Sequence, residues 1–237
     1  MPTITLRHSM LKRIQEINGA IHNQNDLSDL LPKMGCPVEL NDDDDIEIEV
    51  FPDRPDLLSH ETMARAVRSF QGDDTGSSSI EVSDSGIRIN VDGDLEGVRP
   101  IIMGAVVRGV NTGKSASERD SFIQSLMDHQ EKLHMTLGRK RSLASIGVHD
   151  LSKLDHPFRY EAVSGDFSFE PLASKDVMSI SEILDSHPKG IEYSKLMDGL
   201  ETYPIILDSN NEVISFPPII NGIIQPLVKA LMISSLM

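Results

Sequence analysis

The chain has 237 residues, of which 39% are apolar, so it is long enough for one large domain or two modest ones with packed cores. This composition excludes disorder throughout the chain. The formal net charge is −15: residues 1 to 90 carry 8 basic and 17 acidic groups, and the remainder carries 14 and 20. Because phosphate contacts come from Lys and Arg, we exclude a basic nucleic-acid module and expect this chain alone to bind nucleic acid weakly.

The single cysteine, Cys36, cannot form an internal disulfide, and the first residues lack the basic and apolar parts of a secretory signal. We therefore expect a cytoplasmic protein. Residues 219–237 come nearest to the apolar run of about 18 residues that a membrane span needs, but four residues interrupt them. These are Asn221, Gln225, Pro226 and Lys229. We predict no membrane span.

The N-terminal part predicts a strand at residues 3–6, then two short helical patterns, and a second strand after an acidic run. The helical patterns centre on Met10, Leu11 and Ile14 and on Leu27, Leu30 and Leu31, and Pro32 closes the unit. In the second strand Ile46, Ile48 and Val50 alternate with glutamates, so one face should be solvated. The run Asp42 to Asp45 suggests either a metal site or a solvated loop. We favour the loop, because the glycine-centred spacing of a calcium loop is absent.

The next segment starts with two prolines and continues as a helix for which Ser59 is a plausible N-cap. Thr62, Met63, Ala66, Val67 and Phe70 recur on it at helical spacing. The glycine- and serine-rich string that follows has the composition of a flexible connector. We place a linker at about residues 71–95, between a small N-terminal α+β domain, residues 1–90, and a larger mixed α/β domain, residues 91–222.

The second domain should open with a strand, residues 99–107, whose apolar run is long enough to be buried on both faces. A helix follows, capped by Ser117 with Asp120 and ended by Gly138. A further strand, residues 142–148, leads to His149 and Asp150. His149 either lines a functional pocket or belongs to a structural turn, since adjacent strand residues point to opposite faces. The basic run Arg139, Lys140 and Arg141 either faces the helix dipole or contacts phosphate.

Residues 203–216 read as a hairpin whose polar turn begins at Asp208. Pro217 and Pro218 then remove two backbone donors in succession, which ends the ladder and exposes the strand end. Ser215 and Asn221 would lie where a ligand can reach them. The alternative is a simple edge strand with a rigid turn, which the pattern alone favours.

Four runs together carry a resemblance to one family. They are Phe51-Pro-Asp-Arg-Pro-Asp-Leu-Leu-Ser, Ile146-Gly-Val-His-Asp-Leu151, His187-Pro-Lys-Gly-Ile-Glu-Tyr193 and Ser215-Phe-Pro-Pro-Ile-Ile-Asn-Gly222. The chain resembles the beta subunit of phenylalanyl-tRNA synthetase, of the archaeal and eukaryotic type. The resemblance covers residues 1 to 222 in the family's order.

The resemblance implies a B1 domain followed by the B3/B4 domain, where the family hydrolyses tyrosine wrongly attached to phenylalanine tRNA. By similarity, Ile206, Ser215, Pro218 and Asn221 line this editing pocket, and His149 joins them as a further candidate. We find neither a metal cluster nor an obvious general base in the sequence, so we expect the site to work by positioning water. We assign no catalytic residue.

The same resemblance implies an α2β2 enzyme in which the alpha subunit holds the synthetic site. ATP and Mg²⁺ serve that complete enzyme, and we expect no cofactor in this chain. The expected partners are the alpha subunit and phenylalanine tRNA. Two alternatives stay open: a non-catalytic fragment that docks on the alpha subunit, and a free-standing editing factor, which the acidic charge disfavours.

After Gly222 the chain departs from the family, which continues with a strand of the type Phe-Phe-Ile-Asp-Val. We therefore expect residues 223–237 to be a tail foreign to the family that leaves one sheet edge without its strand. Adding one adenine after the Gly222 codon of a back-translated tail restores Phe-Phe-Ile-Asp, and we hypothesise a frameshift. Resequencing the DNA from codon 215 through the stop tests this: an unchanged reading frame would reject it.

Overall fold

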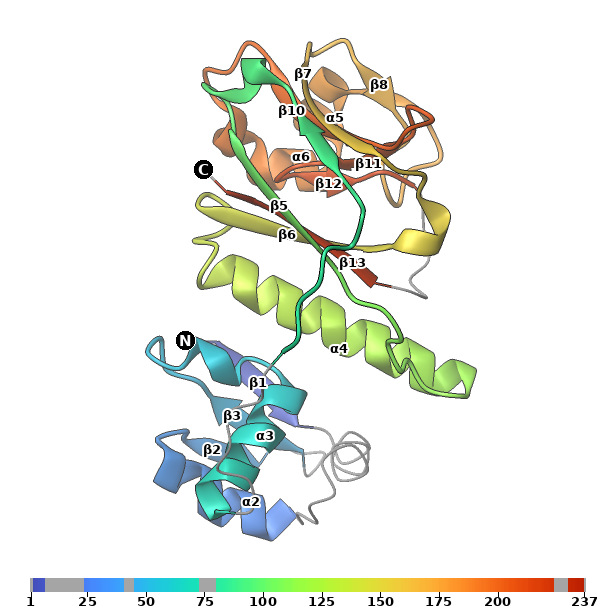
Figure 1. Cartoon of the computed structure of the whole chain (residues 1–237). Coiled ribbons are helices and arrows are strands. Elements are labelled where there is room, and N and C mark those ends of the chain that lie inside the picture. The colour runs from blue at the N-terminus through green and yellow to red at the C-terminus, as the bar shows by residue number, and fades with distance from the viewer. Residues whose placement is uncertain (1, 7–23, 41–44, 73–79, 224–229, 237) are drawn as a thin grey trace. The chain divides into compact units, whose positions relative to one another are not determined.

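The computed structural model describes residues 2–6, 24–40, 45–72, 80–223 and 230–236, without the side chains of residues 24–25 and 230–236. It is a mixed α and β protein, as predicted (Figure 1). The chain divides into two compact units, residues 1–81 with 120–137 and residues 82–119 with 138–237. The division between residues 81 and 82 falls inside the predicted linker. Residues 120–137 belong to the first unit, whereas we expected this helix in the second domain.

The first unit contains a three-stranded antiparallel sheet in the order β1-β3-β2. Its elements are β1 Thr3–Leu6, α2 Gln24–Leu30, β2 Val38–Leu40, β3 Ile46–Glu49 and α3 His60–Gln71. Ile46, Ile48 and Val50 are fully buried while the glutamates between them are half-buried, which confirms the predicted strand with one face toward solvent. The pattern around Met10, Leu11 and Ile14, like Asp42 to Asp44, lies outside the described residues.

Helix α3 begins as predicted at the N-cap Ser59. The Ser59 hydroxyl accepts a hydrogen bond from the Thr62 amide at 3.2 Å, and Thr62 Oγ1 accepts one from the Ser59 amide. Gly72 ends the helix in a left-handed conformation with φ of 85°. Met63 and Val67 enter the core, whereas Phe70, which recurs at the same helical spacing, is 53% exposed.

Helix α4, Ala116–Met135, begins two residues earlier than predicted. Ser115, not Ser117, caps it: the Ser115 hydroxyl accepts from the Glu118 amide, and Glu118 Oε2 accepts from the Ser115 amide at 2.8 Å. Ser125 donates to the Glu61 carboxylate at 3.2 Å, and Leu133 packs against the core of the first unit. These contacts explain why most of α4 belongs to that unit.

The second unit contains a five-stranded sheet in the order β12-β11-β10-β7-β4, in which only β4 and β7 run parallel. A three-stranded sheet has the order β5-β13-β6, and β8 pairs with β9. The strands are β4 Ile89–Val91, β5 Ile101–Val106, β6 Ala144–Asp150, β7 Phe158–Val163, β8 Ser168–Phe169, β9 Met178–Ser179, β10 Tyr203–Leu207, β11 Val213–Phe216, β12 Ile220–Asn221 and β13 Ala230–Leu236. The remaining helices are α5 Ile180–Ser186 and α6 Pro188–Tyr193.

Two apolar clusters cover the two faces of the five-stranded sheet. Residues of α5 and α6, including Ile180, Ile183 and Tyr193, pack with Ile205 and Phe216 in one cluster. The other contains Leu95, Leu154, Phe158, Tyr160, Ile206 and Ile214. Because adjacent strand residues point to opposite faces, Ile205 and Ile206 belong to different clusters.

The prediction that residues 99–107 form a strand buried on both faces is wrong in one respect. The strand exists as β5, but Ile101 and Met103 are 47% and 55% exposed. Only Ile102 and Val106 pack against the cluster that contains Ile206. Strand β5 is at the edge of a three-stranded sheet, and its apolar side chains pack on one face only.

Residues 230–236, which we expected to be part of a foreign tail, form β13 between β5 and β6. The β13 backbone pairs with six residues of β5 and seven of β6. The strands β5 and β6 each obtain a hydrogen-bonded partner in this way. From the sequence we expected one sheet edge to lack its strand. In the structure β13 pairs with this sheet.

Three further observations concern the described part of the chain. Cys36 is buried and free. No helix there is long and apolar enough to cross a membrane. In the same residues, no three His, Cys, Asp or Glu side chains come together as a metal site would require.

The pairing of β13 leads to a stability prediction. A chain that ends at Gly222 should lose the middle strand of its three-stranded sheet and unfold at a temperature at least about 5 °C lower, because about 1 kcal/mol shifts the midpoint by roughly 2–4 °C in a chain of this size. Differential scanning calorimetry measures the change. A chain that ends at Leu236 is the control, and equal midpoints for both truncations would contradict the role of β13.

Candidate functional site

Strand pairing brings three of the predicted site residues into one row. Ile206 on β10 lies opposite Ser215 on β11, and Ser215 lies opposite Asn221 on β12. On its other side Ile206 faces Tyr160 of β7. Directly opposite residues of antiparallel strands point to the same face of the sheet, so these four side chains share one face. The sequence predicted these site residues one by one, and the strand register shows that they lie next to one another.

Ser215 and Asn221 form the polar end of this row. Ser215 Oγ donates to Asn221 Oδ1 at 3.0 Å and approaches the Ile220 carbonyl oxygen at 3.4 Å. Ser215 is 8% exposed and Asn221 is half-buried. Because the side-chain carbonyl of Asn221 accepts the bond from Ser215, its carboxamide is oriented and its two amide N–H groups are left as donors.

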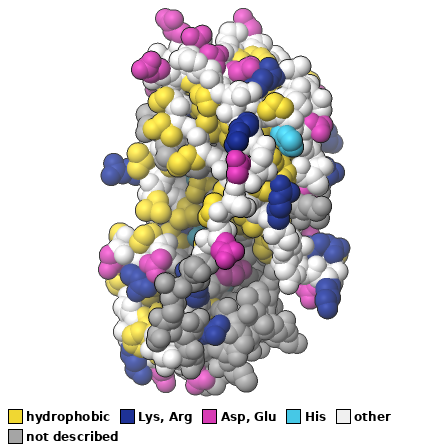
Figure 2. All heavy atoms as spheres, viewed as in Figure 1, with side chains coloured by type: hydrophobic (Ala, Val, Ile, Leu, Met, Phe, Trp, Pro, Cys, Tyr) yellow, Lys and Arg dark blue, Asp and Glu magenta, His cyan; other side chains and the backbone are white. Residues whose placement is uncertain are grey.

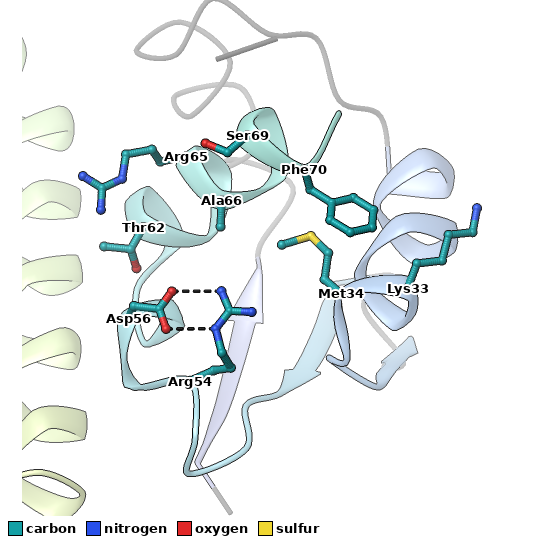
Figure 3. Close-up of a pocket in the computed structure, with 9 residues that line it drawn as sticks. All are labelled: Lys33, Met34, Arg54, Asp56, Thr62, Arg65, Ala66, Ser69 and Phe70. Carbon is teal, nitrogen blue, oxygen red and sulfur yellow. Dashed lines mark hydrogen bonds and ion pairs between the residues drawn. The ribbon is translucent and has the colours of Figure 1, made fainter. Parts of the chain in front are cut away.

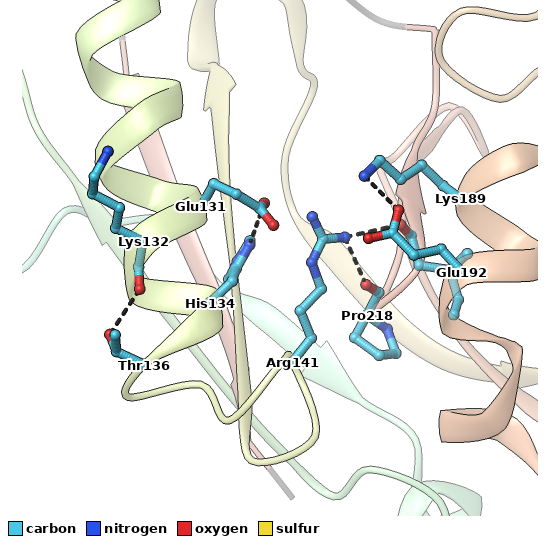
Figure 4. A network of polar contacts seen from close by, with 9 residues as sticks. Glu131, Lys132, His134, Thr136, Arg141, Lys189, Glu192 and Pro218 are labelled. Atoms are coloured by element: carbon cyan, nitrogen blue, oxygen red, sulfur yellow. Dashed lines mark hydrogen bonds and ion pairs between the residues drawn. The ribbon is translucent and has the colours of Figure 1, made fainter. Parts of the chain in front are cut away.

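Arg141 holds the turn between β11 and β12, where Pro218 lies. Its guanidinium donates to the carbonyl oxygens of Pro218 and Ile219, each at 3.1 Å (Figure 4). The same group lies 4.4 Å from the centre of the Tyr193 ring. Arg141 was one of three candidates either for facing the helix dipole or for contacting phosphate, and its side chain bonds to the protein instead.

A chain of hydrogen bonds links Arg141 back to the row. Arg99 Nη2 donates to the Arg141 carbonyl oxygen at 3.1 Å, and the Tyr160 hydroxyl donates to the Arg99 carbonyl oxygen at 2.9 Å. Arg99 is 1% exposed, and this burial lowers the pKa of its guanidinium below the ordinary value. Burial likewise raises the pKa of Tyr160, which stays a neutral donor. Both residues were missed in the sequence analysis, although a charged residue at the start of an apolar run was a signal.

The other two basic residues of the run face solvent. Arg139 and Lys140 are exposed and, like Arg141, have left-handed backbones, with φ of 48° and 55°. The Arg139 carbonyl accepts hydrogen bonds from the amide and the hydroxyl of Ser142. Of the three predicted phosphate contacts, these two have exposed side chains.

His149 lies on β6, in the other sheet of the unit. It is 2% exposed, and burial lowers the pKa of its imidazole to about 4, so it is neutral near pH 7. Its Nε2 has no hydrogen-bond partner among the described residues, and a Cβ added to Gly147 would lie 2.6 Å from it. Asp150 bonds instead to the amide and hydroxyl of Ser152, so the neighbouring carboxylate does not orient the imidazole.

Gly222 fixes the position of Asn221 from the other side. Its amide donates to the Ile214 carbonyl at 3.1 Å, and the Asn221 carbonyl accepts from the Leu172 amide at 2.8 Å. A Cβ at position 222 would collide with the carbonyl oxygen of Val213. Only glycine fits this close approach of two backbones.

The row therefore offers a hydroxyl, a carboxamide and an apolar side chain on a rigid sheet. None of these groups is a general base near pH 7. The arrangement suits the binding and orientation of a polar ligand and of water. A pocket of about 540 Å³ lies elsewhere, in the first unit, and none of the predicted editing residues lines it.

Comparisons with known proteins identify the family. The chain is 43% identical over 222 residues to the phenylalanine--tRNA ligase beta subunit of Methanococcoides burtonii, and 44% identical over 222 residues to that of Archaeoglobus fulgidus. The crystal structure of an N-terminal fragment of the phenylalanyl-tRNA synthetase beta subunit from Pyrococcus horikoshii matches with a TM-score of 0.85 and 30% identity, over 99% of this chain and 67% of that one. The chain belongs to the phenylalanyl-tRNA synthetase beta-subunit family.

The resemblance stated from the sequence is thus confirmed. The match covers 94% of this chain but only 39% of each of these two archaeal ligase beta subunits, so the chain spans about two fifths of their length. No family model matches the sequence. The relatives are named as subunits of an aminoacyl-tRNA synthetase, which places the chain in a family concerned with phenylalanyl-tRNA synthesis.

Gly222→Ala should displace β12 and destabilise the protein by about 1–3 kcal/mol, the usual range for forcing extra atoms into a packed region. Urea denaturation measures the free energy of unfolding. Gly97→Ala is the matched control, because a Cβ at position 97 meets nothing within 4 Å. Equal losses in the two variants would contradict the close approach at Gly222.

The pKa of His149 predicts a pH dependence of stability. Its folded pKa of about 4 lies below the ordinary 6.5, so the unfolded chain binds the proton more readily. The stabilisation is complete above pH 6.5 and falls as the pH drops toward 4, where about 3 kcal/mol should be lost. His149→Gln should flatten this part of the stability curve, whereas His156→Gln, at an exposed site, should leave it unchanged. A curve unaffected by His149→Gln would contradict the prediction.

Proposed function

We propose that the second unit hydrolyses tyrosine wrongly attached to phenylalanine tRNA, as part of a phenylalanyl-tRNA synthetase. The observation that carries the proposal is the row of Ile206, Ser215 and Asn221, with Arg141 holding the adjoining turn. Family membership supports the choice of substrate. The proposal keeps Pro218 as part of the pocket wall, and His149, on β6 of the other sheet, as a further candidate.

The chemistry of the row suits discrimination by a hydroxyl. A synthetic site shaped for phenylalanine cannot strongly reject tyrosine, which only adds a hydroxyl, so a second site must recognise that group. Ser215 and Asn221 supply hydrogen-bonding groups, and Ile206 supplies an apolar wall. A buried polar group left unpaired by phenylalanine would favour the tyrosyl substrate.

The reaction needs only water. The water oxygen forms a bond to the ester carbonyl carbon, the bond from that carbon to the ribose oxygen breaks, and the proton ends on the ribose oxygen. Tyrosine and uncharged tRNA leave. The amide N–H groups of Asn221 would hold the carbonyl or the attacking water in place, and the gain comes from orientation and charge stabilisation.

The complete enzyme belongs to the same proposal. By family membership, the chain would act in the cytoplasm within an α2β2 assembly, where the alpha subunit uses ATP and Mg²⁺ to charge phenylalanine tRNA. On the face shown in Figure 2, Lys and Arg side chains are scattered among acidic and neutral ones. This distribution supports weak tRNA binding by the chain alone, with Arg139 and Lys140 as the phosphate contacts within it.

Asn221→Ala should lower the rate of tyrosyl-tRNA deacylation at least about a hundredfold, the scale for loss of one positioned donor. Deacylation of radiolabelled tyrosyl-tRNA by the chain, with and without the alpha subunit, measures the rate. Asn90→Ala is the control, since Asn90 lies exposed on β4 of the same sheet. Thermal melting shows whether folding is preserved.

Ser215→Ala separates recognition from chemistry. It should reduce the preference for tyrosyl-tRNA over phenylalanyl-tRNA while the protein keeps its melting temperature. If both variants deacylate like the unsubstituted chain, or if the chain purifies with an alpha subunit but never deacylates, the docking fragment is the better description.

A further inference from the structure

The first unit has a pocket of its own, of about 540 Å³ (Figure 3). One side is a face of helix α3, where Thr62, Arg65, Ala66, Ser69 and Phe70 recur at helical spacing. The other side comes from Lys33 and Met34, after α2, and from the turn that contains Arg54 and Asp56. The editing proposal uses none of these residues.

The pocket is basic, in contrast to the chain as a whole. Three basic residues, Lys33, Arg54 and Arg65, line it together with one acidic residue, Asp56, while the chain carries −15. Arg54 donates to both Asp56 oxygens, at 3.0 and 2.9 Å, and thereby lowers the pKa of that carboxyl. The charges of Arg54 and Asp56 cancel, so the net positive charge of the pocket comes from Lys33 and Arg65.

Lys33 and Arg65 are available to a ligand. Both are exposed, and no hydrogen bond or ion pair joins their side chains to a described residue. Figure 3 shows them at opposite ends of the group of lining residues, with Phe70 and Met34 between them. A ligand in the pocket would meet a cation at either end.

Phe70 supplies the apolar part. Its side chain is 53% exposed, and its ring lies beside Met34 (Figure 3). An exposed aromatic ring between two cations suits a ligand that is both planar and anionic. Ser69, also exposed, adds a hydroxyl that can donate to an oxygen.

We propose that this pocket binds a nucleotide, with its base against Phe70 and its phosphate on Arg65 or Lys33. Base stacking on an aromatic side chain contributes about 1–3 kcal/mol, and Lys, Arg and Ser are common phosphate donors. The pocket volume of about 540 Å³ falls within the usual range for small-ligand sites. An aliphatic carboxylate would leave Phe70 unused, and a neutral aromatic would leave both cations unused. The nucleotide is either free or part of a single-stranded RNA segment.

The test uses the 237-residue chain and a fluorescein-labelled hexamer of adenylate as the probe. Fluorescence anisotropy at low salt gives the dissociation constant, and unlabelled AMP and unlabelled hexamer compete. Phe70→Ala should weaken binding about tenfold, within the range for one stacked base, and Phe70→Tyr should restore it. Arg65→Gln should weaken binding and reduce its salt dependence by about one phosphate contact.

Matched controls come from the same unit. Arg68→Gln removes an arginine of α3 that does not line the pocket, and Leu40→Ala removes an apolar side chain, 58% exposed, on β2. Both controls should bind within twofold of the unsubstituted chain, and circular dichroism should show equal helix content in all variants.

Each outcome decides between sources or rejects the site. Competition by AMP supports a free nucleotide, and competition by the hexamer alone supports an RNA strand. Absence of binding overturns the proposal, as does an equal loss in Arg65→Gln and Arg68→Gln, which would indicate diffuse charge attraction. Binding that survives Phe70→Ala unchanged also overturns it.

Discussion

The candidate editing site depends on the two hydrogen bonds from Arg141 to the carbonyls of Pro218 and Ile219. Pro217 and Pro218 have no amide hydrogen, so the turn's own backbone bond is the one that the Ile219 amide donates to the Phe216 carbonyl at 2.8 Å. The Arg141 guanidinium, from another part of the chain, supplies the further donors that hold the Pro218 and Ile219 carbonyls. Asn221 lies two residues after Ile219, so its position opposite Ser215 depends on that turn staying in place.

The site is polar but carries no charge in its row, whereas the pocket of the first unit has a surplus of positive charge. A neutral carboxamide and a hydroxyl suit the orientation of an ester and of water, since neither group titrates near pH 7. Cations around an aromatic ring suit the capture of an anion. The two units thus offer different kinds of binding chemistry within one acidic chain.

Local patterns predicted the local structure. The alternation at Ile46 and Ile48 was readable because a strand with one buried face repeats every two residues, and the cap at Ser59 because its partner Thr62 lies three residues away. At the start of α4, Ser115 with Glu118 and Ser117 with Asp120 both have the spacing of a helix cap. The sequence does not show which serine the helix uses, so the cap was predicted at the wrong serine. The links from Arg99 and Tyr160 to Arg141 and Pro218 join residues far apart in the chain, and no short pattern predicts them. Phe70 recurs at the same helical spacing as Met63 and Val67 but is exposed, because spacing defines a helix face but not what covers it.

The two units are interleaved along the chain. Residues 120–137 belong to the first unit but lie in sequence between two stretches of the second, so the polypeptide passes between the units three times. No single cut releases either unit intact: a piece that starts at residue 82 carries Ser125 and Leu133 without Glu61 and the core they contact. Exchange of one unit by recombination would need three coordinated breakpoints within the gene, one at each passage between the units. The interleaving thus favours inheritance of both units together.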